Sequence, residues 1–375
     1  MKKKRIIRIQ DLVGLMNALY PQALAEDWDN VGLHVGDPRD EVRRVLVALD
    51  PAEWAIEAAV EQDAQLLITH HPLIFRPLKS LQPLDEVGRT LFAAIRNRVA
   101  VFCAHTNLDR ARNGLNDWLA ATVGLKSWEP LLLGSGDLFK LVVFVPHDHQ
   151  EAVAEALFSA GAGHIGNYDC CSFGAEGQGT YRPGAGSNPF QGKIGQLETA
   201  AEIRLETVVP QENLPRVINK MLKAHPYEEV AYDVVALGNQ RPDVGLGRIG
   251  ELPEAISLDD LAVKLKEVLD GTTLRVAGDG RKEMKKIAVC GGSGISVLRE
   301  AARRGADVLV TGDVKYHDAQ LARELGVALI DAGHFGSEHL MVRQLAATLQ
   351  QAADERGLDI DFLPLEGEAD LLRQI

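Results

Sequence analysis

Two adjacent histidines lie just beyond a short apolar run, and histidine side chains can bind a metal or transfer protons. The run is Leu66-Leu67-Ile68, and His70, His71 and Pro72 come after Thr69. An unbroken apolar run is typical of a buried parallel strand. In open α/β sheets, ligands bind beyond the carboxyl ends of the strands. The pair is therefore placed where a metal or a substrate would bind.

Similar side chains follow other predicted strands. They are His105, Asp109, Asp313, His317, Asp331, His334 and Glu338. His334 and Glu338 are four residues apart, so they share one face of a helix and can hold one ion, or Glu338 can bridge two. Imidazole and carboxylate ligands together suit Zn, Mn, Fe, Co or Ni. Two such ions about 3.5–4 Å apart activate water for hydrolysis. A lone histidine is more often a core or surface residue, but this concentration at strand ends favours a metal site.

The elements around these residues alternate between strands and helices. We expect strands at 45–49, 66–68 and 99–104 and helices at 9–20, 51–62 and 90–97. This alternation indicates an α/β fold with a parallel sheet and right-handed crossovers. The helix at 51–62 is predicted to begin with Asp50 as its N-cap and Pro51 at its first position.

The C-terminal part repeats the N-terminal pattern. Residues 45–71 align without gaps on 287–313, with strand on strand and helix on helix. With a shifted register, 99–104 aligns on 327–332, and His105 then nearly coincides with His334. We therefore predict a duplicated α/β core whose strand ends converge on a metal cleft. The alternative is a chance similarity between two ordinary βαβ units.

A segment of different composition separates the two halves. It contains expected strands at 138–146, 201–209 and 229–237, helices at 150–160 and 211–223, and a glycine-rich stretch at 161–195. This order is typical of a ferredoxin-like module. We predict three parts: 1–129 as the first half of the core, 130–243 as an inserted domain, and 244–375 as the second half.

Composition narrows the class of protein. The chain has 375 residues and a net charge of −13, and such an acidic surface makes nucleic-acid binding unlikely. Its four cysteines form no CxxC pair, and this sparse usage fits a reducing compartment. The basic N-terminus lacks the apolar region of a signal peptide, and no apolar run is long enough to cross a bilayer. We expect a cytoplasmic protein that has no contact with membranes.

Three further segments allow two interpretations each. The loop 26–37 either places Trp28 in the core or contacts substrate. The turn Cys290–Ser296 is a tight strand-to-helix turn or a phosphate site, although it lacks the third glycine of GxGxxG and the Walker lysine. Cys170 and Cys171 either pack in the inserted domain or bind a soft metal, and packing is the preferred interpretation.

Several motifs together resemble one known family. They are Ile68-Thr-His-His-Pro72, His105-Thr-Asn-Leu-Asp109, Val310-Thr-Gly-Asp-Val-Lys-Tyr-His317 and Asp331-Ala-Gly-His-Phe-Gly-Ser-Glu338, with Trp28-Asp-Asn-Val-Gly-Leu33 near the start. They resemble the dinuclear-metal-centre family, whose members are called GTP cyclohydrolase I type 2 homologues. The resemblance covers nearly the whole chain. It implies a toroidal homohexamer with two divalent transition-metal ions per subunit.

The resemblance also implies roles for single residues. It makes His70, His71, Asp109, His334 and Glu338 the metal ligands, with Glu338 bridging. It places His105, Asp313, His317 and Asp331 around those ligands or against the substrate. The segment His225-Pro-Tyr-Glu-Glu-Val230 resembles the trimer-forming CutA and PII-like folds, as in longer family members.

Two functions remain open. The first is a metal-dependent hydrolase that uses water activated by two metals on a nucleotide or another phosphorylated small molecule. His317 is then the candidate for proton transfer, and its alternative role is a hydrogen-bonded neighbour of the ligands. The second is a non-enzymatic metal-binding or regulatory scaffold whose inserted domain senses a ligand.

Overall fold

The computed structural model describes residues 6–134, 137–269 and 273–372. The chain forms two compact units, Met1–Leu133 with Asp243–Ile375, and Gly134–Pro242. The α/β fold class predicted from the sequence is confirmed. The domain boundaries at 130 and 243 stay a proposal. None of the helices in the described ranges is both long and apolar enough to span a membrane.

The first sheet of the larger unit has the order β1-β4-β3-β2-β15. Its strands are β1 (Gly32–Val35), β4 (Ala100–Cys103), β3 (Leu66–Thr69), β2 (Arg44–Ala48) and β15 (Asp361–Pro364). All adjacent pairs are parallel except the pair of β1 with β4. Strand β15 comes from the end of the chain, so residues of the second half complete the sheet of the first half.

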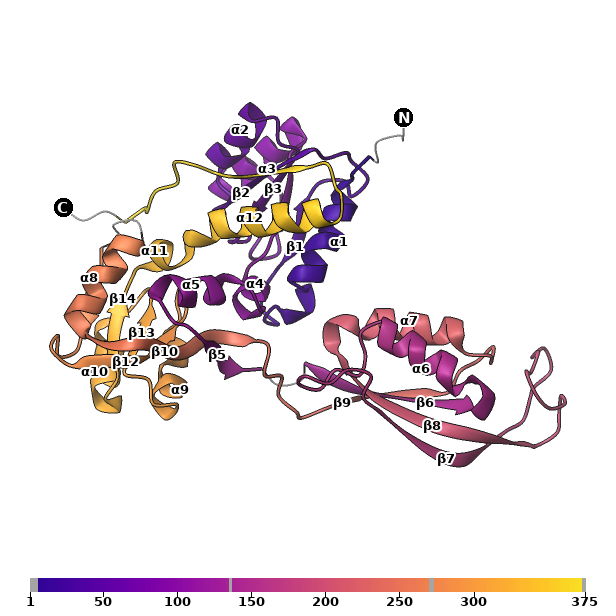
Figure 1. Ribbon diagram of the computed structural model, residues 1–375. Helices are drawn as coiled ribbons and strands as arrows, with labels where there is room; N and C mark the ends of the chain where they lie inside the picture. Colours follow the sequence, from indigo (N-terminus) through magenta and orange to yellow (C-terminus); the bar gives the residue numbers. More distant parts are fainter. Residues whose placement is uncertain (1–5, 135–136, 270–272, 373–375) are drawn as a thin grey trace. The chain divides into compact units, whose positions relative to one another are not determined.

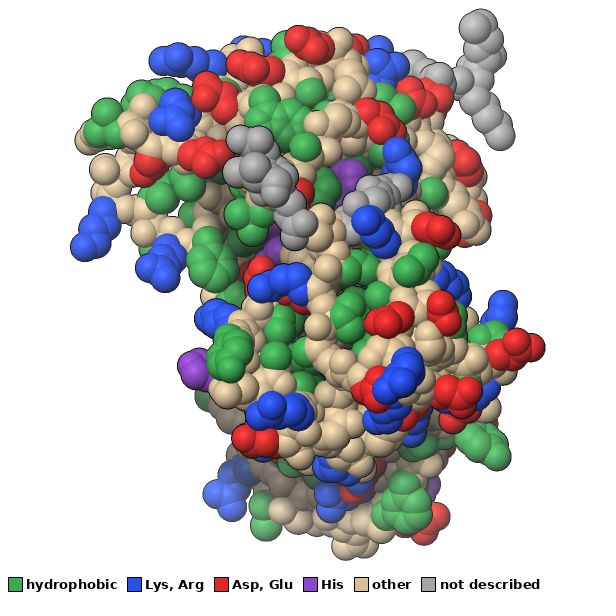
Figure 2. Space-filling view, turned by 90° about the vertical axis from the view of Figure 1, so that its left-hand side faces the viewer, with side chains coloured by type: hydrophobic (Ala, Val, Ile, Leu, Met, Phe, Trp, Pro, Cys, Tyr) green, Lys and Arg blue, Asp and Glu red, His purple; other side chains and the backbone are tan. Residues whose placement is uncertain are grey.

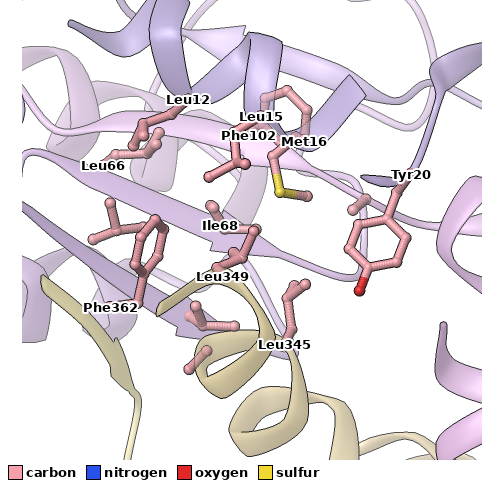
Figure 3. Close-up of a cluster of buried hydrophobic side chains, with 14 of the residues drawn as sticks. Leu12, Leu15, Met16, Tyr20, Leu66, Ile68, Phe102, Leu345, Leu349 and Phe362 are labelled. Carbon is pink, nitrogen blue, oxygen red and sulfur yellow. The ribbon is translucent and has the colours of Figure 1, made fainter. Parts of the chain in front are cut away.

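Helices cover both faces of this sheet because successive strand residues point to opposite sides. They are α1 (Ile9–Leu19) and α12 (Leu340–Glu355) on one face, and α2 (Glu53–Glu61) and α3 (Glu86–Asn97) on the other. Figure 3 shows Leu12 and Met16 of α1 and Leu345 and Leu349 of α12 meeting around Ile68. The neighbouring Leu67 belongs to the core on the opposite face. The apolar run 66–68 is therefore buried on both sides of the sheet, as its sequence predicts.

The second sheet has the order β11-β14-β13-β12-β10-β5. Its strands are β11 (Arg275–Ala277), β14 (Ala328–Asp331), β13 (Val308–Thr311), β12 (Glu283–Val289), β10 (Gly245–Ser257) and β5 (Trp128–Leu133). The parallel set β14-β13-β12 repeats the order of β4-β3-β2 in the first sheet. Helices α5 (Leu115–Val123) and α8 (Leu258–Val268) cover one face, and α9 (Leu298–Arg303) and α10 (Tyr316–Leu325) cover the other.

A buried ion pair links strand β10 of the second sheet to helix α5. Arg248 on β10 is 1% exposed and donates to the carboxylate of Asp117 on α5. Its other nitrogens donate to the carbonyls of Gly245, Gly247 and Ala111. Because its hydrogen bonds are made within the protein, this guanidinium fixes β10 against α5.

The smaller unit is a four-stranded antiparallel sheet with two helices on one face (Figure 1). Its elements are β6 (Leu138–Pro146), α6 (Gln150–Ser159), β7 (Ser172–Tyr181), β8 (Glu198–Pro210), α7 (Leu214–Ala224) and β9 (Tyr232–Ala236). The order β7-β8-β6-β9 is that of a ferredoxin-like module. Strand β7 lies inside the glycine-rich stretch, where the sequence pattern predicts no strand. Cys170 is exposed, so the prediction that it packs in this unit is wrong.

The surface carries both signs of charge. Figure 2 shows acidic and basic side chains interspersed over the face in view, with hydrophobic side chains between them. No continuous basic stripe is visible on that face, and the net charge is −13. Charges of both signs thus alternate over the face in view.

Candidate metal centre

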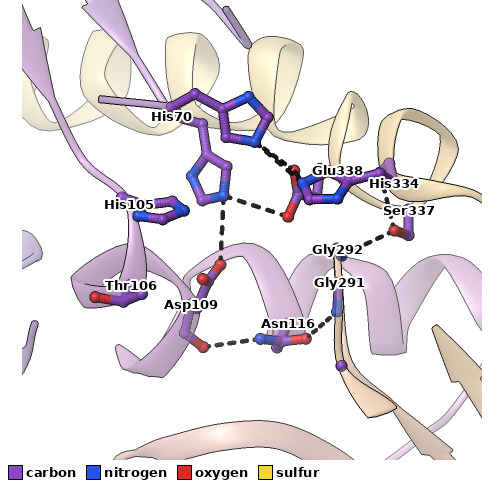
Figure 4. Close-up of polar contacts among 12 residues, drawn as sticks. His70, His105, Thr106, Asp109, Asn116, Gly291, Gly292, His334, Ser337 and Glu338 are labelled. Carbon is purple, nitrogen blue, oxygen red and sulfur yellow. Dashed lines mark hydrogen bonds and ion pairs between the residues drawn. The ribbon is translucent and has the colours of Figure 1, made fainter. Parts of the chain in front are cut away.

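Glu338, at the end of the short helix α11 (His334–Glu338), lies between two groups of histidine nitrogens (Figure 4). Its Oε2 is 3.0 Å from Nε2 of His71 and 3.2 Å from Nε2 of His334. Its Oε1 is 3.6 Å from Nε2 of His70. The two carboxylate oxygens thus face different nitrogens, so Glu338 could offer one oxygen to each side of the site.

His70 and Asp109 form the buried side of the site. Nε2 of His70 and Oδ1 of Asp109 are buried, have no hydrogen-bond partner and lie 3.6 Å apart. Buried polar atoms are normally paired, so two facing orphans require an explanation. Two donors about 2.1 Å from one zinc ion at the tetrahedral angle lie about 3.4 Å apart. The observed separation therefore fits two ligands of one cation.

His71 and His334 form the open side of the site. Their Nε2 atoms are 3.3 Å apart, and both lie within ligand distance of Glu338, so these three side chains can hold one ion. The side chains of His71 and His334 are 23% and 39% exposed, whereas that of His70 is fully buried. Solvent therefore reaches the site from the side of His71 and His334.

Each histidine of the site is oriented through its other ring nitrogen. Nδ1 of His70 lies 2.9 Å from the carbonyl of Ala104, and Nδ1 of His71, His334 and His105 lie 2.7–2.9 Å from the carboxylates of Asp50, Asp313 and Asp29. When Nδ1 donates its proton to such an acceptor, Nε2 carries the free lone pair. Carboxylate or carbonyl acceptors of this kind are usual behind histidines that bind metals. The four Nε2 atoms are thus prepared as ligands or bases.

Charge in the site is arranged around the carboxylates. Burial raises the pKa of Glu338, but the neighbouring imidazoles outweigh it and hold that pKa well below its usual range. Burial lowers the pKa of His71, yet Asp50 and Glu338 raise it to about 10. The bond to Glu338 raises the pKa of His334 to about 9. The positive charge of the protonated imidazoles balances the buried carboxylates. A divalent metal would replace the protons on these imidazoles.

A glycine turn allows Glu338 to approach. A Cβ at Gly292 would lie 2.1 Å from Oε1 of Glu338, and Gly292 has a φ of +57°. The N–H groups of Gly291, Gly292 and Gly294 donate to Asn116, Ser337 and Thr311, respectively. Asn116 also donates to the carbonyl of Asp109 (Figure 4). Because these N–H groups already have partners, the structure favours the tight-turn interpretation of Cys290–Ser296 over the phosphate site.

The early loop lies at the edge of the site. Trp28 is 60% exposed, so the interpretation that places it in the core is wrong. Its ring contacts those of Phe75 and His105, at 5.9 and 6.2 Å between centroids. The next residue, Asp29, accepts hydrogen bonds from His105 and Thr106, and these bonds fix the loop with Trp28 outward. The alternative interpretation, a loop that contacts substrate, stays a prediction.

The remaining candidates have different surroundings. Asp313 orients His334, and Asp331 is buried, where it accepts hydrogen bonds from Arg275 and from the N–H of Gly333. One ring nitrogen of His105 lies within 4.8 Å of a ring nitrogen of His70 and of His71. His317 is exposed, and its Nδ1 lies 2.9 Å from Oε1 of Gln320. Its role in proton transfer stays a prediction.

Five further residues support the site in roles that the sequence motifs do not reveal. They are Asp29, Asp50, Asn116, Gly292 and Ser337. Asp50 is predicted to be a helix cap, but α2 begins after Ala52 and the carboxylate of Asp50 binds His71 instead. Asp50 follows the end of a predicted strand, so the rule that selects His70 could also select it. Asn116 and Ser337 act through backbone groups far away in sequence, and no local pattern signals such contacts.

Comparisons with known proteins agree with this geometry. The chain matches the family Duf34/NIF3 (NGG1p interacting factor 3) over residues 7–370. It is 41% identical over 360 residues to the "GTP cyclohydrolase 1 type 2 homolog" of Halalkalibacterium halodurans, covering 96% of each chain. It is 40% identical over 358 residues to the protein of the same name from Bacillus subtilis, covering 95% of this chain and 96% of that one.

A solved structure shows the same fold. The Bacillus cereus protein related to NIF3 superposes with a TM-score of 0.86 at 39% identity, covering 99% of this chain and 100% of that one. The family predicted from the four motifs is therefore confirmed, and this chain belongs to the DUF34/NIF3 family, whose similar members are named GTP cyclohydrolase 1 type 2 homologues.

Proposed function

We propose that this protein is a metal-dependent hydrolase that acts on a nucleotide or another phosphorylated small molecule. The observation that supports it best is the pair of buried, unpartnered ligand atoms on His70 and Asp109, which face a carboxylate shared with His71 and His334. The proposed ligands are His70, His71, Asp109, His334 and Glu338. Zn, Mn, Fe, Co and Ni all suit such ligands.

In this proposal, two bound divalent ions supply the Lewis-acid chemistry that lowers the pKa of water and stabilises negative charge in the transition state. Glu338 holds the two sides of the site together through its two oxygens. Asp50, Asp313 and Asp29 keep the imidazoles in one tautomer, and such orientation before reaction lowers its cost.

Other residues would act on the substrate side. His71 and His334 lie on the exposed side of the site, where a substrate can enter. Trp28 lies exposed beside His105, so its ring is available to stack on a purine or another flat group. His317, exposed at the start of α10, remains the candidate for moving a proton to the leaving group.

The name of the relatives suggests the first substrate to test. Similar proteins are named GTP cyclohydrolase 1 type 2 homologues, so GTP is the first candidate, followed by other nucleotides and sugar phosphates. We also propose a homohexamer in the cytoplasm, by resemblance to the family, and a mass measurement in solution tests the hexamer.

Turnover by metal-loaded protein tests the hydrolase proposal. We expect phosphate release or ring opening with one substrate class, loss of that activity with chelator, and a loss of at least about 100-fold in Glu338→Ala. The control is Glu324→Ala, which removes an exposed carboxylate on α10 and leaves turnover unchanged. If wild type binds metal but converts nothing in the panel, the hydrolase proposal is wrong and the scaffold function replaces it.

A further inference from the structure

The smaller unit contains a cavity that the metal centre does not use. Its volume is about 640 Å³, within the range of small-molecule sites, and its lining residues lie between Phe144 and Ala231. Residues on β8 alternate between the two faces of the sheet: Ile203 and Leu205 pack with the helices, while Glu202 and Arg204 line the cavity. The cavity therefore lies on the sheet face opposite α6 and α7.

A buried carboxylate points into this cavity. Glu202 is 8% exposed, and its Oε1 accepts a hydrogen bond of 3.0 Å from the hydroxyl of Tyr227. Its Oε2 lies against Gly179, where a Cβ would be 2.2 Å away, so only a glycine leaves room for this side chain. Within the described residues, no donor contacts Oε2 at hydrogen-bond distance. This oxygen is therefore free to accept a hydrogen bond from a ligand in the cavity.

The other charges of the cavity are also mainly negative. Carboxylates of Glu176, Glu228 and Glu229 line it with Glu202, against the guanidiniums of Arg182 and Arg204. Arg204 is already paired with Glu206, at 2.9 Å. Burial, Glu198 and Glu202 raise the pKa of the Tyr181 phenol, which also lines the cavity. An anionic ligand would meet repulsion here, and a cationic one attraction.

Aromatic rings form the apolar part of the lining. They belong to Phe144, Tyr181, Phe190 and Tyr227. The ring of Phe190 packs against those of His149 and Tyr227, at 5.4 and 5.8 Å between centroids. The N–H of Asn188 donates to Glu228, and this bond helps to hold the loop that carries Phe190 beside Tyr227. Aromatic faces attract cations and bury apolar groups.

We propose that this cavity binds an organic cation, a protonated amine carried on an apolar body. The ammonium group takes the free oxygen of Glu202, and the rings of Tyr181, Phe190 and Tyr227 surround the body. The proposal concerns the smaller unit alone, so it stands or falls independently of the hydrolase function.

Three probes with one indole body and different charges test it. Tryptamine carries an ammonium group, tryptophol a neutral hydroxyl and indole-3-acetate a carboxylate. In calorimetric titrations of the full-length, metal-loaded protein, we expect tryptamine to bind at least about tenfold more tightly than tryptophol. Indole-3-acetate should bind most weakly. The proposal would be overturned if tryptamine did not bind, and also if tryptamine and tryptophol bound with equal affinity. A second copy of the chain that fills the cavity would give the first of these results.

Matched variants locate the binding. Glu202→Gln keeps the shape and the hydrogen bond from Tyr227, so tryptamine should lose at least about tenfold in affinity while tryptophol changes little. Gly177→Val adds a side chain where a Cβ has no atom within 4 Å, and it should weaken all indole binding by filling the cavity. Glu155→Gln, which changes an exposed carboxylate on α6 outside the lining, is the control with unchanged affinity.

Melting temperature and metal content show whether each variant is folded. Undiminished tryptamine binding by both Glu202→Gln and Gly177→Val would place the site elsewhere and contradict the proposal. Because Gly177→Val leaves every carboxylate in place, it tests the cavity even if Glu202→Gln does not fold.

Discussion

Gly292→Ala should weaken metal binding by moving Glu338. The new Cβ would lie 2.1 Å from Oε1 of Glu338 and 3.3 Å from Nε2 of His334. An ordinary contact between carbon and oxygen is about 3.3 Å, so the carboxylate must retreat by about 1 Å. Displacements and lost contacts around a metal typically cost 10- to 100-fold in affinity, so we expect about 100-fold here.

The backbone has its own cost at this position, and a second glycine measures it. Gly292 has a φ of +57°, where alanine costs roughly 1–2 kcal/mol. Gly305 has a φ of +74°, and no atom lies within 4 Å of the place that an added methyl group would take. Gly305→Ala therefore has the same backbone cost without crowding Glu338. Gly305→Ala should lose only the backbone cost in stability, and only Gly292→Ala should lose metal affinity.

The assay is a competition titration of metal-free protein with Zn²⁺ and a chromophoric chelator, combined with elemental analysis. Thermal unfolding of each metal-free variant gives the backbone cost. If Gly292→Ala binds Zn²⁺ as tightly as wild type, the placement of Glu338 as a shared ligand is refuted.

Three further predictions follow from single contacts. Asp50→Asn removes the charge behind His71, so metal affinity should fall about 10- to 100-fold in the same titration, while exposed Glu61→Gln on α2 changes nothing. Burial raises the pKa of Asp29, but hydrogen bonds from His105 and Thr106 outweigh burial and lower that pKa from 3.8 to about 2. Asp29 therefore contributes about 2 kcal/mol of stability above about pH 4, and this is lost as the pH falls through about 2. In denaturant unfolding of metal-free protein, the stability difference between wild type and Asp29→Asn should shrink over that range, and a constant difference would contradict it. Arg248→Met leaves the carboxylate of Asp117 buried without its cation and should cost about 3–5 kcal/mol in denaturant unfolding, whereas Arg303→Met breaks an exposed pair and should cost less than about 1 kcal/mol.

Local pattern was enough to predict the strands that carry the site. The apolar runs at 66–68 and 99–104 became β3 and β4, which are buried on both faces. Strand β7 was missed because it is edge-located and glycine-rich, with the sequence Ser-Phe-Gly-Ala-Glu-Gly-Gln-Gly-Thr-Tyr. Strand β15 was missed because its pairing with β2 depends on the return of the chain end, which no local signal shows.

The candidate ligands could be selected from the sequence because strand ends gather at one edge of a sheet. Their orientation could not. Asp50 reads locally as a helix cap before Pro51, but its bond to His71 spans 21 residues. Trp28 reads as a core residue by its hydrophobicity, yet the hydrogen bonds of Asp29 hold it at the surface. Tertiary contacts outweighed local preference in both cases.

Anomalous X-ray scattering from crystals of metal-loaded protein tests the central claim most directly. Data collected at the absorption edge of the loaded metal locate each ion against the side chains. We predict two peaks per chain, one beside His70 and Asp109 and one beside His71 and His334, with Glu338 between them. A chain with no peak at these residues, or with ions bound only elsewhere, would contradict the dinuclear site and the hydrolase built on it.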